Sequence, residues 1–269
     1  MPTFATPQPI TATIEIVSGS VHLTASDRDD TVVTVSPRDP NRASDVRVAE
    51  SARVDFTTGT LTVTAGRRII SLGRGGAVTV DIELPSRSRL HVSSASAKLR
   101  ADGDFGECRL STASGDAAIG SVTGNFKSDS ASGAISVDIL TGEGTVSTAS
   151  GDATFGELAG DVKFRAASGS LSVKRLHGIV NAQTASGDTT IAAAVSGEVS
   201  VQSGSGDTHV GVEEGTAAKL DLRTHSGHVR NNLQPTGGPT DGDETLHVRV
   251  KTGSGDISVQ RATATARSR

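Results

Sequence analysis

The sequence predicts an all-β protein built as a parallel β-solenoid (β-helix), and two observations carry this prediction. The first is a glycine that recurs every nine residues, at Gly106, Gly115, Gly124, Gly133, Gly142, Gly151, Gly160, Gly169, Gly178 and Gly187. The intervals between these glycines read as short β-strands, and every second glycine lies in a Ser-Gly turn. Two short strands then make one coil of eighteen residues.

The second observation is that apolar residues share columns when the chain is aligned at this eighteen-residue period. One column holds Ile119, Val137, Phe155, Val173 and Ile191. A parallel solenoid requires such columns, because each coil lies about 4.8 Å above the last and buries the same positions. An antiparallel meander of nine-residue hairpins also explains the glycines, but it has no reason to keep an eighteen-residue period.

Before the regular repeats, residues 1–95 predict irregular N-terminal strands. Residues 10–36 alternate between apolar and polar, and Gly19 and the acidic segment 27–30 divide them into three strands. Further strands are expected at 52–57, 60–64 and 77–84.

An excursion interrupts these strands at residues 37–53, where Pro37 and Pro40 break the alternation. We expect a short surface helix there, with Ser44 or Asp45 as its N-cap.

The regular repeats occupy residues 96–215, and C-terminal coils follow at 216–260. Within these coils, residues 231–244 are rich in Gly, Pro, Asn and Asp and predict a long loop. The tail at 261–269 is expected to fray. Because no linker composition divides the chain, we expect residues 1–269 to form a single domain.

Composition agrees with a repeat fold and excludes some functions. The chain has no Trp, no Tyr and six Phe, so its core must be built from smaller side chains that accumulate burial coil by coil. A net charge of -4 gives no electrostatic reason to expect nucleic acid as a partner. Cys108 is the only cysteine, which excludes an internal disulfide and indicates a small buried thiol.

The N-terminal residues have no basic segment followed by an apolar stretch, and no later segment approaches membrane-spanning length. We therefore expect a cytoplasmic protein without membrane insertion. Removal of a leader would instead make it extracellular or place it on the cell surface.

The Ser-Gly-Asp turns supply the most prominent candidate site residues, Asp116, Asp152, Asp188, Asp207 and Asp256. Such a series resembles a carboxylate ladder for calcium, but the first three aspartates are thirty-six residues apart and would lie about 9.6 Å from one another. Because Ca²⁺ binds oxygens at about 2.3–2.6 Å, one ion cannot bridge that gap. We interpret these residues as structural turn aspartates.

The histidines and motifs point to no metal, cofactor or catalytic residue. Only His225 and His228 are close in sequence, and no cysteine or glutamate completes a metal-binding set at a recognised spacing. We interpret both as exposed turn residues. No nucleophile elbow, phosphate-binding loop or dinucleotide fingerprint is present.

Several segments together resemble a known family. They are Pro-Ile-Thr-Ala-Thr-Ile-Glu-Ile at 9–16, Ser-Asp-Val-Arg at 44–47, Val-Asp-Ile-Glu-Leu-Pro at 80–85, the repeated Thr-Ala-Ser-Gly-Asp, the segment 224–233 and the segment 251–259. The chain resembles the bacterial β-strand-repeat family called domain of unknown function 4097, also labelled "putative adhesin". The resemblance covers nearly the whole chain and implies a β-solenoid-like repeat fold. It supplies no catalytic or ligand-binding residues.

These observations favour a non-enzymatic scaffold or interaction protein that presents a regular surface to a protein partner or to itself. Pairing through an uncapped, apolar end coil is one route to such an interaction. The alternative is a surface adhesin or glycan-binding module that uses loops such as 231–244, although the chain lacks Trp and Tyr as platforms for sugar rings. A third hypothesis is a polysaccharide-active β-helix enzyme that uses Asp116, Asp152 or Asp188.

Overall fold

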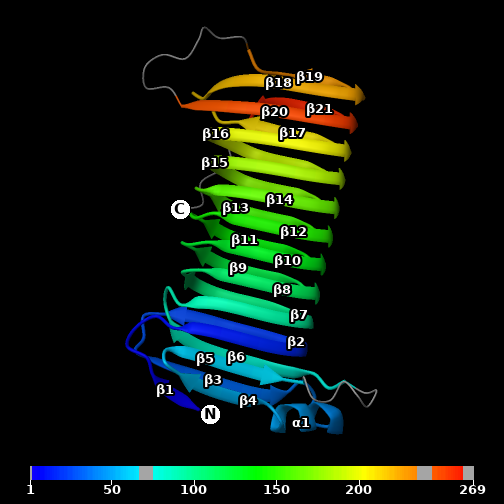
Figure 1. The fold of residues 1–269 in the computed structure, drawn as a ribbon. Helices are drawn as coiled ribbons and strands as arrows, with labels where there is room; N and C mark the ends of the chain where they lie inside the picture. Colours follow the sequence, from blue (N-terminus) through cyan, green and yellow to red (C-terminus); the bar gives the residue numbers. More distant parts are fainter. Residues whose placement is uncertain (1, 67–74, 235–243, 263–269) are drawn as a thin grey trace. The chain divides into compact units, whose positions relative to one another are not determined.

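The computed structural model describes residues 2–66, 75–234 and 244–262, and the chain divides into two compact units, Met1–Val137 and Asp138–Arg269. Most of the predicted loop at 231–244 and most of the predicted tail at 261–269 lie outside the described residues. Each unit is built almost entirely of β-strands that pair mainly in parallel, as the sequence predicts (Figure 1). The extent of the domain over residues 1–269 stays a prediction.

The first unit contains one helix and ten complete strands among its described residues. They are β1 (Thr3–Ala5), β2 (Thr11–Ser26), β3 (Asp30–Pro37), α1 (Ala43–Glu50), β4 (Arg53–Thr57), β5 (Thr60–Ala65), β6 (Val78–Pro85), β7 (Arg89–Phe105), β8 (Cys108–Ser114), β9 (Ala117–Val122) and β10 (Phe126–Ser132). The next strand, β11 (Ile135–Leu140), contains the division between the units.

The parallel ladders of this unit keep the eighteen-residue period. Cys108 on β8 lies between Leu90 on β7 and Phe126 on β10, and Ala117 on β9 pairs with Leu99 on β7. The long strand β7 therefore contributes one half to the ladder of β8 and the other half to the ladder of β9. In this coil the predicted pair of short strands is one continuous strand.

Strand order departs from sequence order at the start of the chain. Along β2, Thr11 pairs in parallel with Thr60 on β5 and with Arg89 on β7, and the second half of β2 pairs with β6 and β7. The strand β2 thus lies between β7 and the later coil formed by β5 and β6. It also runs unbroken through Gly19, so the predicted turn there is wrong.

The N-terminal end of the first unit is antiparallel rather than solenoidal. Strand β4 pairs antiparallel with β5, β3 with β6, and β1 with β3. The rings of Phe4 and Phe56, on β1 and β4, stack with centroids 5.1 Å apart. The prediction of parallel strands therefore fails at this end.

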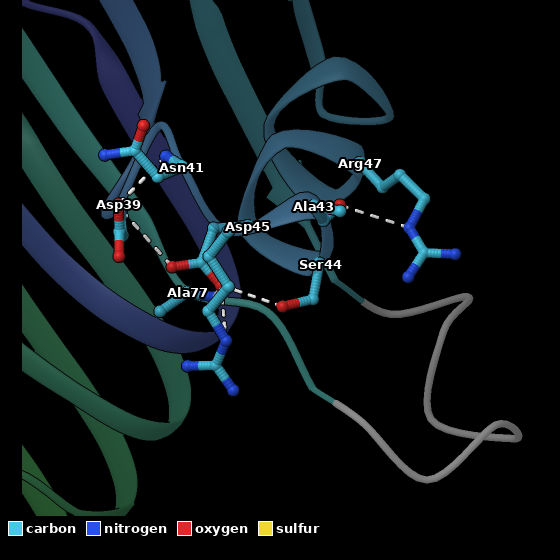
Figure 2. Close-up of polar contacts among 8 residues, drawn as sticks. Asp39, Asn41, Ala43, Ser44, Asp45, Arg47 and Ala77 are labelled. Carbon is cyan, nitrogen blue, oxygen red and sulfur yellow. Dashed lines mark hydrogen bonds and ion pairs between the residues drawn. The ribbon is translucent and has the colours of Figure 1, made fainter.

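The predicted helix at 37–53 is present as α1, but its cap is wrong. The N-cap residue is Arg42, which makes no side-chain capping hydrogen bond, and Ser44 and Asp45 lie in the first turn. The buried Asp45 carboxylate instead accepts hydrogen bonds from the Ala77 N–H (3.2 Å) and the Asp39 N–H (3.3 Å), as Figure 2 shows. Asp45 therefore ties the helix to the segment before β6 and to the segment after β3.

The environment of Asp45 favours its charged form. Burial by itself would raise the pKa of this carboxyl, but hydrogen bonds from Ala77, Ser44 and Asp39 and the charge of Arg42 together lower it.

The second unit consists of ten complete strands among its described residues. They are β12 (Gly144–Ser150), β13 (Ala153–Leu158), β14 (Asp161–Ser168), β15 (Leu171–Ser186), β16 (Thr189–Ser205), β17 (Thr208–Val212), β18 (Ala217–Ser226), β19 (Val229–Asn231), β20 (Thr245–Ser254) and β21 (Ile257–Arg261). The eighteen-residue register joins β12 to β14, β13 to β15 and β14 to β15. It shifts by one residue at Leu176/His177, where β15 meets β16.

The last coil in sequence is not the last coil of this unit in space. Strand β20 pairs with β16 on one side and with β18 on the other, and β21 pairs with β17 and β19. The coil of β20 and β21 therefore lies inside the stack, and β18 with β19 forms the end coil (Figure 1).

The predicted apolar columns form the core of each unit. In the second unit Phe155, Val173 and Ile191 are in register on adjacent strands, and each is 0% exposed. Because this column consists of phenylalanine and β-branched side chains, burial accumulates along the stack without Trp or Tyr.

Candidate functional site

A groove of about 500 Å³ opens on the outward face of the first unit. It crosses four adjacent strands, β2, β7, β8 and β10, whose outward side chains are held in register by the parallel ladders. The inward neighbours on these strands are buried, which keeps the strands rigid beneath the groove.

Two rows of polar side chains line this groove. The first row is Thr13, His91, Arg109 and Lys127. The second row is Glu15, Ser93, Ser111 and Asp129. Neighbours within a row lie about one strand spacing, 4.8 Å, apart.

Arg109 and Lys127 in the groove are each paired with a carboxylate two residues away along the chain. Arg109 Nε lies 2.8 Å from Glu107 Oε1, and Lys127 Nζ lies 3.4 Å from Asp129 Oδ2. Both cations are exposed and their carboxylates are at least partly exposed, so each pair stabilises the fold little. These ion pairs hold the charged groups in place, and a charged group of a bound molecule can replace one member of a pair.

The two carboxylates of the second row are too far apart to act as an acid–base pair. Glu15 and Asp129 are separated by the strands of Ser93 and Ser111, which places them about 14 Å apart. Glycosidase carboxylates lie about 5–9.5 Å apart. The groove therefore offers recognition by charge and hydroxyl groups.

Within each unit, aspartates of the Ser-Gly-Asp turns accept backbone hydrogen bonds from the next turn and form a ladder. In the first unit Asp116 Oδ1 accepts the Ala134 N–H at 3.1 Å, and in the second Asp152 Oδ1 accepts the Ser170 N–H at 2.8 Å. Asp188 follows on the next coil, where its N–H donates to Ser170 Oγ at 3.3 Å. At this turn position the sequence alternates aspartate with a small residue, Ala134 or Ser170.

The alternation ends at Asp188, because Asp207 occupies the next turn in sequence and the inserted coil of β20 and β21 stacks Asp256 on it. Asp188 Oδ1 accepts the Asp207 N–H, and Asp207 Oδ1 accepts the Asp256 N–H, both at 2.8 Å. Each carboxylate satisfies a backbone N–H of the next turn. These hydrogen bonds offset the repulsion between stacked charges.

Basic residues close the ladder at the end coil. Asp256 Oδ1 accepts the His228 N–H at 2.9 Å and lies 3.4 Å from His228 Nδ1, and Asp256 Oδ2 lies 3.6 Å from Arg230. The backbone hydrogen bond from His228, with the His228 side chain and Arg230, lowers the pKa of Asp256. His225 lies on β18, exposed to solvent, and the structure does not bring it into the ladder.

These candidates do not combine into a metal site. Over residues 2–66, 75–234 and 244–262, no three His, Cys, Asp or Glu side chains gather as ligands for an ion. Cys108 is buried as predicted, and burial raises the pKa of its thiol to about 12. In the part of the chain that is described, no helix has the length and apolar character to span a membrane.

Sequence reasoning missed the groove, although part of its signal was present. His91, Arg109 and Lys127 are eighteen residues apart, so the repeat that aligns the core also aligns them. Comparing outward columns as well as apolar ones would have found this row. Thr13 and Glu15 carry no such signal, because β2 joins the groove out of sequence order.

The family model Toastrack DUF4097 matches residues 11–260. The chain belongs to this family. The match includes every strand of the groove and of the aspartate ladder, and it confirms the resemblance drawn from the sequence motifs. No curated protein matches this DUF4097 chain.

The chain is similar to solved structures of other bacterial proteins. One is a "putative adhesin" from Bacteroides fragilis, with 14% identity, 96% of this chain and 95% of the other covered, and a TM-score of 0.49. Another is a "putative lipid binding protein" from Parabacteroides distasonis, with 12% identity, coverage of 97% and 96%, and a TM-score of 0.46.

Proposed function

We propose that this DUF4097 protein is a non-enzymatic interaction protein that binds a protein partner through the groove of its first unit. The observation that carries the proposal is the pair of polar rows held in register across β2, β7, β8 and β10. These side chains stand on rigid strands with buried inward faces rather than on a loop. Binding a partner therefore loses little conformational entropy in ordering them.

The chemistry of the groove supports binding over turnover. Its carboxylates stand too far apart for paired acid–base work, and each groove cation already has a neighbouring carboxylate. A partner segment with both charge signs would match these rows, because it could replace each existing pair with an equivalent one.

The test is capture of partners from the native host by the wild-type protein and by a variant with Arg109→Glu and Lys127→Glu. The matched control reverses two exposed cations on the half of β7 that pairs with β9, away from the groove residues, with Lys98→Glu and Arg100→Glu. Each partner that mass spectrometry identifies is then purified and its affinity measured directly. We expect the groove variant to lose at least about tenfold in affinity and the control to retain it. Equal binding by all three proteins would contradict the proposal.

The cytoplasmic location expected from the N-terminal sequence is also a proposal, and it is tested by fractionating the native host. Recovery of the untagged protein from the cytosol would support an intracellular partner. Recovery from the envelope or medium would instead favour the adhesin or glycan-binding hypothesis, and a glycan array probed with the groove variant would then decide between glycan and protein ligands.

A further inference from the structure

The end coil of the second unit has a strand edge without a neighbour in the described part of the chain. Strand β18 pairs with β20 alone, and β19 pairs with β21 alone. The Ala217 N–H donates toward β20, to Glu244 O. Because hydrogen-bonding sides alternate along a strand, Ala218, Leu220 and Leu222 turn their N–H and C=O groups to the open side.

The same coil leaves the end of the apolar core incompletely covered. Ala218, Leu220 and Leu222 are in register with Leu246, Val248 and Val250 on β20. The three β20 side chains are at most 1% exposed, whereas their β18 counterparts are only half-buried. Val229 on β19 is 45% exposed, although its register partner Ile257 is 0% exposed. Covering this end would remove apolar surface from water.

The N-terminal end of the first unit carries features that protect a sheet edge. Its outermost strands, β1 and β4, are 3 and 5 residues long and pair antiparallel. Pro37 ends β3, and α1 follows. Proteins use short strands, proline and covering helices to block unwanted pairing. By contrast, β18 is a regular strand of 10 residues, and no proline interrupts it.

The outward charges of β18 are complementary to those of a second β18 strand that runs antiparallel to it. Lys219, Asp221 and Arg223 alternate along one face of the strand. If β18 pairs antiparallel with its copy about a twofold axis at Leu220, Lys219 faces Asp221 of the second copy, and an axis at Leu222 sets Asp221 opposite Arg223. An axis at Asp221 would oppose like charges throughout. Opposite charges across an antiparallel pair stabilise it, so the charge pattern selects the first two registers.

We propose that the end coil of β18 and β19 pairs with the same coil of a second copy of this chain through antiparallel β18 strands. The dimer is one form of the interaction role proposed above. It does not use the groove, so loss of groove binding and loss of the dimer are separate outcomes.

The test is sedimentation equilibrium of the full chain over a wide range of concentrations. We expect a dimer for the wild type. Asp221→Lys makes the outward row uniformly positive and should raise the dimer Kd at least about tenfold. The triple variant Lys219→Asp, Asp221→Lys, Arg223→Asp inverts the pattern, restores complementarity and should restore the dimer. The control Glu157→Lys makes the same charge change at an exposed site on β13 and should have no effect.

A second variant guards against failure of Asp221→Lys to fold, since Asp221 also lies 3.7 Å from Arg249 on β20. Ala218→Pro removes an N–H that faces the open edge and should weaken the dimer without breaking a bond to β20. A monomeric wild type at every concentration would overturn the proposal. A dimer that neither Asp221→Lys nor Ala218→Pro weakens, or a triple variant that folds and stays monomeric, would also overturn it.

Discussion

Single buried hydroxyl groups differ sharply in what they contribute to the first unit. Ser88 and Ser128 are both 0% exposed. Ser88 Oγ donates to Pro85 O at 2.6 Å and accepts the Ile10 N–H at 3.0 Å. Ser128 Oγ has no hydrogen-bond partner within the described residues and borders a small cavity. The first hydroxyl joins distant segments, and the second carries a desolvation cost without a matching bond.

We therefore expect opposite consequences when each serine is replaced by alanine. Ser88→Ala leaves the Ile10 N–H buried and unpaired and should lower the free energy of unfolding by about 1–3 kcal/mol. Ser128→Ala should change it by less than about 1 kcal/mol, or raise it. Urea denaturation of both variants measures the difference. Equal destabilisation would show that Ser128 has a partner, such as an ordered water.

The turn glycines are required by close approach of successive coils, and Gly115 shows the reason. Its φ is +135°, and a Cβ at this position would lie 2.1 Å from Ala97 O on the preceding coil. The regular spacing of glycines is therefore a steric requirement of coil stacking.

Gly115→Ala should consequently destabilise the first unit by more than about 2 kcal/mol, since neither the backbone angle nor the space suits a side chain. The control is Gly75→Ala, where a Cβ would meet no atom within 4 Å, and it should stay within about 0.5 kcal/mol of the wild type. Chemical denaturation compares the two. A mild effect at Gly115 would show that adjacent coils can move apart.

At the level of elements, α1 is held by a tertiary contact rather than by its own cap. A helix of 8 residues is marginal by itself, and its N-cap residue Arg42 offers no side-chain hydrogen bond. Asp45 supplies the missing stabilisation by accepting N–H groups from both segments next to the helix. Aspartate is typical of N-caps, but Asp45 instead anchors the helix to the segments at Asp39 and Ala77.

This anchor should depend on pH in a defined direction. Because the pKa of Asp45 is lowered in the folded protein, its stabilisation is complete above the ordinary carboxyl value of 3.8 and is lost as the pH falls through the lowered value. We expect Asp45→Asn to lower the Tm near neutral pH and the gap from wild type to close in acid. Thermal unfolding of both proteins from neutral to acidic pH measures this gap. A gap that is constant with pH would contradict a charged Asp45.

At the level of the whole molecule, a coil is out of sequence order in each unit. In the first unit β2 lies between β7 and the coil of β5 and β6, and in the second β20 and β21 lie between β16, β17 and the end coil. An inserted coil is bonded on both edges, so neither the first nor the last long strand of the chain is left to fray. Among the described residues, β18, an internal segment, has an edge without a strand neighbour.

If this edge pairs two copies, stability must depend on protein concentration. The Tm of the wild type should rise with concentration, because a dimer that forms only from folded chains stabilises the folded state by mass action. The Tm of Asp221→Lys should rise less with concentration than that of the wild type, because its dimer is weaker. Calorimetry at several concentrations provides the measurement, and identical behaviour of the two proteins would argue against the dimer.

The sequence by itself determined the repeating part of this protein. Strand alternation, turn glycines and apolar columns recur every eighteen residues, and each is read from local spacing, so the parallel coils and the core residues Phe155, Val173 and Ile191 were predictable. The family followed from motifs in the same repeats.

Only the tertiary structure decided the order of the coils, the anchoring role of Asp45 and the composition of the groove. The pairing of Thr11 with Arg89, and the insertion of β20 between β16 and β18, join segments with no periodic relation in sequence. The same insertion stacks Asp207 on Asp256 and leaves β18 at the edge. Which segments pair in this way depends on the free energy of closing long loops and burying the core of the whole fold. A local sequence pattern does not contain that information.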